Sequence, residues 1–212
     1  GREVFKAGRT TGVRSGKTSF GPLWAHREMI RRGPGDGLVA APSFPLLDKG
    51  AIPEINAFFG SLLRLGSPSA RQFTISEDGH RRLWGEAAIS RPSRIIYGHA
   101  QNPESLAALT AKAAWLDEAG QNAFRLASFE EVQRRVSFDR GRILISTTVY
   151  NMAWLKQRVY DPWQEAKGDH PEIDLINFKS IENPAFPREE YDRAFRDWPL
   201  WKAIIDEPQR RG

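Results

Sequence analysis

A glycine, a lysine and a threonine follow one another near the start of the chain, as Gly16, Lys17 and Thr18. Residues 12–18 read Gly-Val-Arg-Ser-Gly-Lys-Thr, which matches the end of a phosphate-binding loop. In such a loop, backbone N–H groups around Ser15 and Gly16 surround an anion at a helix N-terminus. The lysine then reaches the β- and γ-phosphates, and the threonine hydroxyl binds Mg²⁺. The segment therefore predicts a site for ATP and Mg²⁺.

Two features depart from the usual loop. Thr11 stands where the first glycine is expected, and Gly12 follows it. Gly21 and Pro22 fall inside the helix that should follow the loop, and we expect them to kink or restart that helix. The predicted nucleotide-binding residues are Gly12, Val13, Arg14, Ser15, Gly16, Lys17, Thr18 and Ser19.

Two carboxylates, Asp117 and Glu118, follow the apolar residues 113–116, one hundred residues after Lys17. Taken alone, the pair fits an acidic turn or a helix N-terminus, where the helix dipole favours acids. In a chain that also has a phosphate loop, the two carboxylates predict a catalytic pair instead. Asp117 is expected to hold Mg²⁺ with Thr18, and Glu118 to polarise the attacking water. Lys17 and Glu118 are thus the predicted catalytic residues.

A third apolar segment, residues 142–146, ends in the hydroxyl-bearing residues Ser146, Thr147 and Thr148. In a P-loop ATPase, residues at this position sense the γ-phosphate and transmit its loss to the parts that bind DNA. The alternative is that Thr147 and Thr148 cap the next helix, and both roles are compatible.

Strands and helices alternate along the chain. We expect strands at residues 3–7, 38–41, 72–76, 82–84, 94–97, 113–116, 142–146 and 173–178. We expect helices at residues 17–32, 46–65 with a boundary or kink at Pro53, 102–110, 123–136, 152–167 and 187–205. This order predicts a mainly parallel sheet flanked by helices, with ligands at the carboxyl ends of the strands. Residues 1–170 are the predicted P-loop ATPase core, and residues 171–212 its C-terminal lid and linker.

The composition excludes several other kinds of site. Of the 212 residues, 40% are hydrophobic, which is enough for a single domain with a sizeable core. There is no cysteine, so disulfides, thiolate metal sites and thiol catalysis are excluded. The four histidines are scattered without ligand spacing, which disfavours a histidine metal site. The apolar runs are far too short to span a bilayer.

The charge balance indicates an anionic partner. The formal net charge is +5, and 23 of the 31 basic residues are arginines, whose planar fork binds two phosphate oxygens at once. Nucleic acid is the first candidate, and contacts to DNA phosphates are expected to be independent of sequence and weaker at high salt. The alternative is a solubilising surface charge. The arginine pairs that would contact phosphate or solvent are residues 31–32, 81–82, 134–135 and 210–211.

These motifs together resemble the ATPase domain of the large terminase subunits of tailed bacteriophages, the motors that package DNA. Residues 12–18 resemble the terminase phosphate loop, which often carries a basic residue such as Arg14. The other similar segments are residues 40–43 (Ala-Ala-Pro-Ser), 102–106, 115–119, 143–148 with Trp154, and 182–187. The resemblance covers nearly the whole chain. It implies an α/β P-loop NTPase fold of the ASCE or RecA-like kind.

The resemblance also implies partners and a location. A terminase motor forms a ring, a pentamer when docked, on the portal protein of a viral procapsid, in the host-cell cytoplasm. It works with a small terminase subunit and translocates double-stranded DNA by hydrolysing ATP. The family also carries a C-terminal nuclease domain, whose metal-binding acids have no counterpart here. We therefore expect this chain to be one piece of a longer protein, without nuclease activity of its own.

One family residue is missing. The family often has an arginine finger just after the segment that residues 102–106 resemble, and this chain has Ala107 there. Such an arginine is worth about 10³–10⁵ in turnover. The candidates to replace it, from the same subunit or a neighbouring one, are Arg14, Arg91, Arg94, Arg134 and Arg135.

Two other functions remain open from the sequence. The same chemistry serves helicases and translocases of superfamily 2, although 212 residues leave no room for their second motor half. The absence of an arginine at residue 107 also fits a nucleotide-binding assembly module without turnover of its own.

Overall fold

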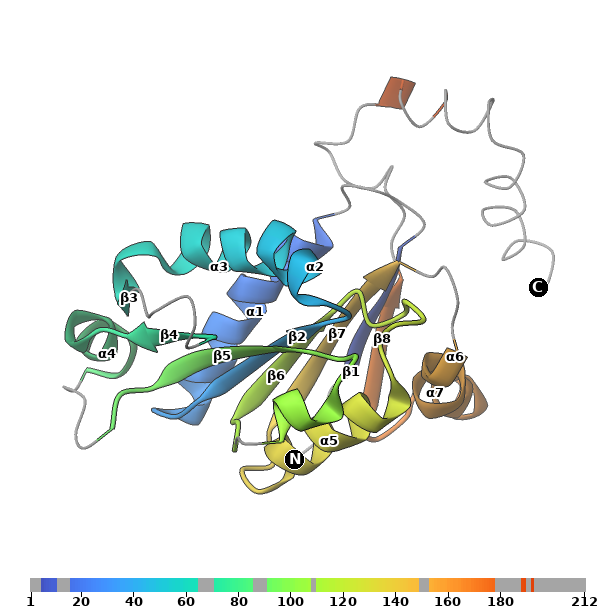
Figure 1. Cartoon of the computed structure of the whole chain (residues 1–212). Helices are drawn as coiled ribbons and strands as arrows, with labels where there is room; N and C mark the ends of the chain where they lie inside the picture. Colours follow the sequence, from blue (N-terminus) through green and yellow to red (C-terminus); the bar gives the residue numbers. More distant parts are fainter. Residues whose placement is uncertain are drawn as a thin grey trace.

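Eight strands form one sheet in the order β3-β4-β5-β2-β6-β7-β1-β8 (Figure 1). The computed structural model describes residues 5–10, 16–64, 71–85, 91–107, 110–148, 153–177, 188, 189 and 192. The strands are β1 (Phe5–Thr10), β2 (Gly37–Ala41), β3 (Leu63–Arg64), β4 (Gln72–Ile75), β5 (Arg94–His99), β6 (Ala113–Asp117), β7 (Arg142–Thr148) and β8 (Ile173–Asn177). The six neighbouring strands β5, β2, β6, β7, β1 and β8 run parallel to one another. The antiparallel pairs are β3 with β4 and β4 with β5. The predicted mainly parallel sheet is confirmed.

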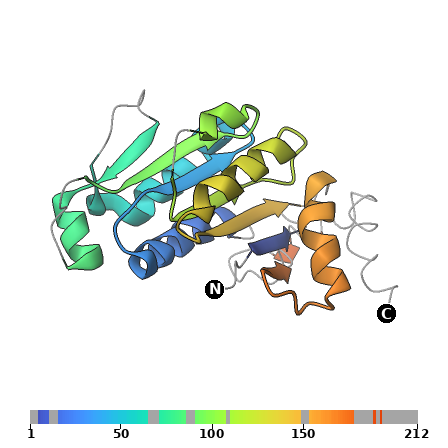
Figure 2. The ribbon, with the colours of Figure 1, turned by 90° about the horizontal axis from the view of Figure 1, so that it is seen from below.

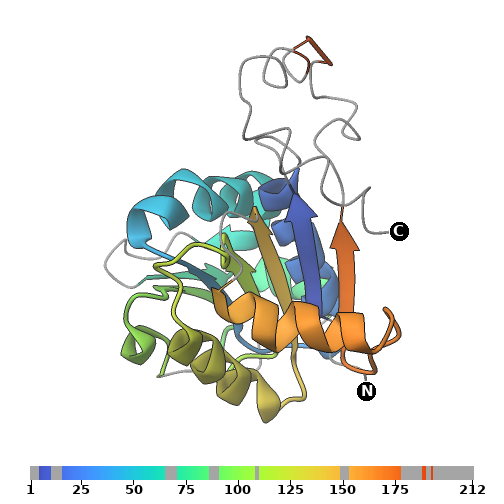
Figure 3. The same cartoon turned by 90° about the vertical axis from the view of Figure 1, so that its right-hand side faces the viewer.

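Helices cover both faces of the sheet (Figures 1 and 3). The helices α1, α2 and α3 lie on one face, and α5, α6 and α7 on the other, where α6 and α7 run beside the β1–β8 end (Figure 2). Their bounds are α1 (Lys17–Arg32), α2 (Phe44–Lys49), α3 (Ala51–Phe59), α4 (Glu77–Trp84), α5 (Leu126–Ser137), α6 (Ala153–Leu155) and α7 (Asp161–Glu165). Short 3₁₀ helices span Gly60–Leu62 and Pro103–Leu106, and a π-helical turn, Lys156–Tyr160, joins α6 to α7.

Two hydrophobic cores, one on each face, explain why the central strands are apolar throughout. Alternate residues of a strand point to opposite faces, so a strand covered on both sides needs apolar side chains at every position. In β2, Val39 packs with α1 and α3 while Leu38 packs with α5. In β6, Trp115 and Leu116 divide in the same way.

Several local predictions were wrong. The helix described within residues 102–110 is the 3₁₀ helix Pro103–Leu106, and Leu63–Arg64, expected near the end of the helix 46–65, form β3. Residues 82–84 were expected as a strand, but they end helix α4, because Ser76 caps it by accepting a hydrogen bond from the Gly79 N–H at 3.0 Å. The break in the predicted helix 46–65 falls at Gly50, between α2 and α3, and Pro53 sits in the first turn of α3, where proline is tolerated.

Helix α1 also continues through Gly21 and Pro22 instead of restarting there. The predicted helix 187–205 and the motif at residues 182–187 lie almost wholly outside the described residues. The strand predicted at residues 173–178 is confirmed as β8, which pairs with β1. The boundary at residue 170 stays a prediction. In the part of the chain that the structure describes, no helix has the length and apolar character needed to cross a membrane.

Candidate functional site

The start of α1 places Lys17 at the carboxyl end of the sheet. Gly16 precedes the helix with a φ of 81°, a left-handed conformation that glycine adopts without strain. The Lys17 side chain is only 8% exposed. Its ammonium donates a hydrogen bond to the Thr148 hydroxyl at 2.9 Å and lies 3.6 Å from Glu118 Oε1. The predicted phosphate-binding lysine and water-polarising carboxylate are therefore neighbours.

Strand order accounts for this meeting of distant residues. Strand β7 lies between β1, which leads into the phosphate loop, and β6, which carries the acidic pair. In the register of the sheet, Thr148 is opposite Thr10 at the end of β1, and Ser146 is opposite Asp117 at the end of β6. Because all three strands are parallel, their carboxyl ends form one edge.

A short chain of hydrogen bonds holds the Asp117 carboxylate. The Trp115 indole N–H donates to the Ser146 hydroxyl at 2.8 Å, and that hydroxyl donates to Asp117 Oδ1 at 2.7 Å. Each hydroxyl donates only one proton, so the indole fixes the direction in which Ser146 donates. The other carboxylate oxygen, Oδ2, borders Gly50 together with Thr18: a Cβ on Gly50 would lie 3.7 Å from Oδ2 and 3.8 Å from Thr18 Cγ2.

Burial shapes the acidity of this carboxyl. Asp117 is 4% exposed, and burial raises its pKa to about 6. The hydrogen bond from Ser146 and the positive charge of Lys17 lower the pKa of Asp117, while the charge of Glu118 raises it. A bound cation would stabilise the ionised form, so the site is suited to bind metal and lose a proton together.

Glu118 sits in a strained turn directly after β6. Its φ is 52°, a left-handed conformation that is costly for a residue with a side chain. Two contacts hold the turn: the Gly120 N–H donates to Thr147 Oγ1 at 2.8 Å, and the Thr148 N–H lies 3.4 Å from Glu118 Oε2. A Cβ on Gly120 would lie 2.6 Å from Thr147 Oγ1, so only glycine fits. The end of β7 thus fixes where Glu118 points.

The donor set fits Mg²⁺. Thr18 and Asp117 both lie close to Gly50 and offer a hydroxyl and a carboxylate, and Mg²⁺ prefers such oxygen ligands. The described residues contain no group of three or more His, Cys, Asp or Glu side chains suited to holding a metal on their own. This matches an ion that uses one carboxylate and completes its shell with water and phosphate oxygens.

The structure brings together six of the predicted site residues: Lys17, Thr18, Asp117, Glu118, Ser146 and Thr148. Thr147 lies in the same strand but binds the turn after β6 instead. Ser19 is an exposed residue of α1. Gly12, Val13, Arg14 and Ser15 lie outside the described residues.

The remaining arginine-finger candidates lie away from this site. Arg91 and Arg94 bind Asp36, directly before β2, and Arg134 and Arg135 occupy the last turn of α5. All four are at the amino ends of the parallel strands. A five-residue strand such as β6 separates the two ends by about 17 Å. None of the four reaches Lys17 of its own chain.

Sequence reasoning missed two residues of the site. Gly21 is where the Trp115 indole packs against α1, since a Cβ there would lie 2.2 Å from the ring. Gly50 lies beside both Thr18 and Asp117, as described above. The sequence did carry a signal for Gly21, because a glycine in the second turn of a helix, followed by a proline, weakens the helix and calls for another reason to be there.

No protein-family model matches the chain, and no curated protein sequence matches it either. Solved structures do match. The large terminase of a thermophilic bacteriophage has a TM-score of 0.72 at 13% identity, covering 95% of this chain and 47% of that one. A structure of that large terminase in complex with ADP has a TM-score of 0.69 at 14% identity, covering 93% and 46%. The chain therefore spans about half the length of that protein.

A second terminase matches over most of its own length. The ATPase domain of the large terminase of Thermus phage P74-26 has a TM-score of 0.66 at 17% identity. The match covers 95% of this chain and 86% of that domain. The predicted P-loop NTPase fold is confirmed. The chain has the fold of the ATPase domain of phage large terminases.

Proposed function

We propose that this chain is the ATPase motor domain of a large terminase, which hydrolyses ATP to drive double-stranded DNA into a procapsid. The observation that carries the proposal is the cluster of Lys17, Glu118 and Thr148 at the start of α1 and the ends of β6 and β7. The fold supports it, and so do the thermophilic-phage large terminase structures in complex with ADP and ATP-γ-S.

Each residue of the cluster has a distinct task in this reaction. The Lys17 ammonium pairs with the β- and γ-phosphates, exchanging its bond to Thr148 for bonds to phosphate oxygens. The Glu118 carboxylate orients the attacking water by accepting its hydrogen bond. Thr18 and Asp117 would hold Mg²⁺, which neutralises charge on the phosphate oxygens. Ser146 donates to Asp117 Oδ1 and so holds the orientation of this carboxylate.

The same contacts couple nucleotide to motion. Lys17 binds Thr148 Oγ1 and lies beside Glu118, so a phosphate that attracts Lys17 also weakens its contact with the end of β7. Thr147 holds the turn that carries Glu118. Loss of the γ-phosphate would thus be transmitted to the segment that follows Thr148.

We further propose that the site is completed by a neighbouring subunit in a ring docked on the portal, with the small terminase subunit as an accessory, in the host cytoplasm. The basis is that none of Arg91, Arg94, Arg134 and Arg135 reaches Lys17 in cis; Arg14, the fifth candidate, lies outside the described residues. The same observation favours the second candidate, a nucleotide-binding assembly module without turnover.

ATP turnover per subunit, measured against protein concentration with Mg²⁺, separates these functions. A motor completed by its neighbour should show a rate that climbs with concentration and falls at least about 10²-fold in Glu118→Gln. Glu118→Gln should still bind nucleotide, whereas Lys17→Ala should not. Asp48→Asn is the matched control, because Asp48 is an exposed residue of α2.

Nucleotide binding without turnover at any concentration would favour the assembly module. Nucleotide binding unchanged by Lys17→Ala would overturn the proposed site. A terminase should package duplex DNA when the full-length protein is mixed with procapsids, whereas a helicase should separate the two strands. Measuring both activities distinguishes the two functions.

A further inference from the structure

Three buried carboxylates near the amino ends of the parallel strands are each shared by two or three arginines. The first is Glu28 in α1, which is 1% exposed. Arg142, at the start of β7, donates to Glu28 Oε1 at 2.8 Å. Arg31 and Arg32, in the last turn of α1, lie 3.8 and 3.7 Å from the Glu28 carboxylate. One negative charge here faces three positive ones.

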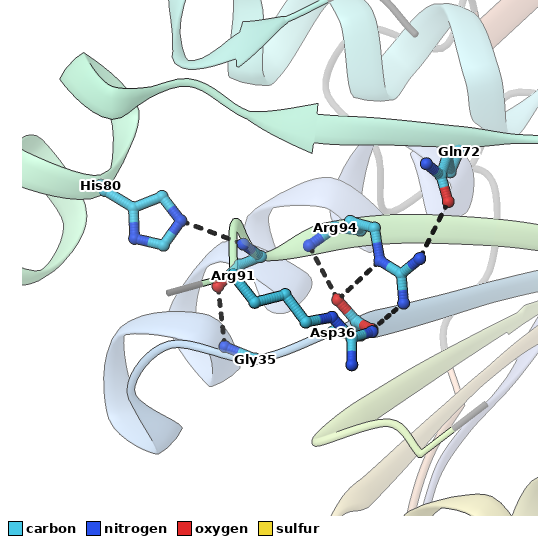
Figure 4. A network of polar contacts seen from close by, with 7 residues as sticks. Gly35, Asp36, Gln72, His80, Arg91 and Arg94 are labelled. Carbon is cyan, nitrogen blue, oxygen red and sulfur yellow. Dashed lines mark hydrogen bonds and ion pairs between the residues drawn. The ribbon is translucent and has the colours of Figure 1, made fainter. Parts of the chain in front are cut away.

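The second carboxylate is Asp36, directly before β2 (Figure 4). Arg91 and Arg94 approach it together, with Nη2 atoms 2.5 and 2.6 Å from Oδ2, and the Arg94 backbone N–H donates to Oδ1 at 3.0 Å. Gln72 Oε1 accepts a further bond from Arg94 at 3.3 Å. Asp36 is buried, while Arg91 extends into solvent.

The third carboxylate is Glu131 of α5, which is also buried. Arg134 Nη2 lies 2.5 Å from Oε2, and Arg135 donates to Oε1 through both Nε and Nη2. These two hydrogen-bonded charges lower the pKa of Glu131, and burial opposes them. Arg134 is 70% exposed.

Hydrogen bonds join the three clusters into one surface. Lys112, directly before β6, donates its backbone N–H to Asp36 O at 2.8 Å and its ammonium to Arg32 O at 3.0 Å. The third cluster is linked through the neighbouring residue, because the Ala111 N–H donates to Arg135 O at 3.0 Å. We call this surface the basic end. It consists of Arg31, Arg32, Arg91, Arg94, Lys112, Arg134, Arg135 and Arg142 with their three carboxylates.

The basic end carries an unbalanced charge. Seven arginines share three carboxylates, which leaves a surplus of four positive charges on a chain whose formal net charge is +5. Other ion pairs are matched one to one, among them Arg81 with Glu77, Arg82 with Asp78 and Arg158 with Glu130. Attraction to helix C-termini explains cations such as Arg31 and Arg134. It does not explain Arg91, Arg94 or Arg142, which lie outside helices.

We propose that the basic end is a docking surface for the phosphate backbone of double-stranded DNA. Buried acids hold the arginines in place without neutralising them, so their forks are ordered in advance for phosphate oxygens. The surface crosses the starts of β5, β2, β6 and β7, a width of about 14 Å. Single-strand binding relies on successive aromatic side chains. Among the described residues, the exposed large hydrophobic side chains adjacent in sequence to this surface are Ile30 and Phe138, and of these two only Phe138 is aromatic.

The test is binding of a fluorescent DNA duplex by anisotropy, without nucleotide, at several salt concentrations. The triple variant Arg31→Ala, Arg91→Ala, Arg134→Ala removes the most exposed arginine of each cluster (59%, 65% and 70% exposed). Each buried carboxylate keeps at least one arginine, so the fold is preserved. We expect duplex binding to weaken on the order of tenfold or more, with a salt slope lower by about one per lost phosphate contact.

The control removes the same charge elsewhere. The variant Arg71→Ala, Arg125→Ala, Arg158→Ala replaces three exposed arginines outside the basic end, which lie directly before β4, directly before α5 and in the π-helical turn between α6 and α7. It should change duplex affinity less than about twofold if location matters more than net charge. Equal loss in both variants, no loss in either, or no duplex binding by the unaltered chain would overturn the proposal. So would tighter binding of single strands that Phe138→Ala abolishes. Because the assay contains no nucleotide, its result does not depend on ATP hydrolysis.

Discussion

The indole of Trp115 occupies the space that any side chain at residue 21 would need. A Cβ on Gly21 would lie 2.2 Å from two atoms of the Trp115 ring. The ring is buried between α1 and β6, and its N–H holds Ser146, which in turn holds Asp117. Close packing of a helix glycine on a tryptophan thus sets the position of a carboxylate at the candidate site.

Gly21→Ala should therefore damage both stability and the site. The added methyl group must displace a buried ring, and overpacking of this kind costs about 1–3 kcal/mol. Because alanine has a higher helix propensity than glycine, the substitution would otherwise stabilise α1. A loss of stability would therefore identify the contact with Trp115. Thermal unfolding and Mg·ATP affinity are the measurements. Gly37→Ala is the control, because a Cβ there would meet nothing closer than Ala113 O at 4.0 Å. An unchanged melting temperature in Gly21→Ala would contradict the packing argument.

Ser146→Ala should shift the pH dependence of metal–nucleotide binding. It removes the hydrogen bond that lowers the pKa of Asp117 and leaves the Trp115 N–H without its acceptor, at a cost of about 1–3 kcal/mol. The pKa of Asp117 should rise further above 6, so Mg·ATP binding should fail at a higher pH than in the unaltered chain. Ser146→Thr keeps the hydroxyl and should restore the profile. A uniform loss of binding at every pH would point to a structural effect alone.

Asp117→Asn should stabilise the nucleotide-free protein above pH 6. Burial raises the pKa of Asp117 from its ordinary value of 3.8 to about 6, so the folded state binds this proton more tightly than the unfolded chain does. Its contribution to stability is present below about pH 4 and is lost as the pH rises to about 6. At about pH 8 the variant should gain up to about 3 kcal/mol, with no gain at about pH 4. Denaturant unfolding at both pH values checks this, with Asp48→Asn as the exposed control. A gain of equal size under the acidic condition would exclude titration as its cause.

Glu28→Gln should destabilise the fold strongly. Glu28 is buried against Arg32 and Arg142, and removing its charge leaves their guanidinium groups without a counter-charge. Breaking a buried ion pair in this way costs about 3–5 kcal/mol. Arg31→Ala, which removes an exposed partner of the same carboxylate, should cost less than about 1 kcal/mol. Similar losses in both variants, measured by urea unfolding, would show that burial of Glu28 is not decisive.

Local pattern was sufficient for most of the fold. The strands at residues 38–41, 113–116 and 142–146 are short apolar runs between polar loops, and burial on both faces of a parallel sheet requires that composition. Lys17 was identified from the phosphate-loop pattern of residues 12–18, and Asp117 because it follows an apolar strand. In a parallel sheet, residues directly after strands meet at one edge whatever their separation in sequence.

The errors arose where distant contacts outweigh local preference. Residues 82–84 are helical because Ser76 caps α4, and Leu83 and Trp84 pack against the core on the α1 face. Gly21 has no local purpose in a helix, and only the Trp115 ring explains it. A one-dimensional pattern does not contain the ring's position.

Residue types alone were enough to predict the chemistry: a lysine and a threonine for phosphate and metal, and two carboxylates after a buried strand. Their arrangement came from the folded chain. Folding directs Ser146 to Asp117 and Thr148 to Lys17, and it places the arginines of the basic end at the opposite end of the sheet. A residue's type fixes what its side chain can bind, whereas strand order and packing fix which partners lie within its reach.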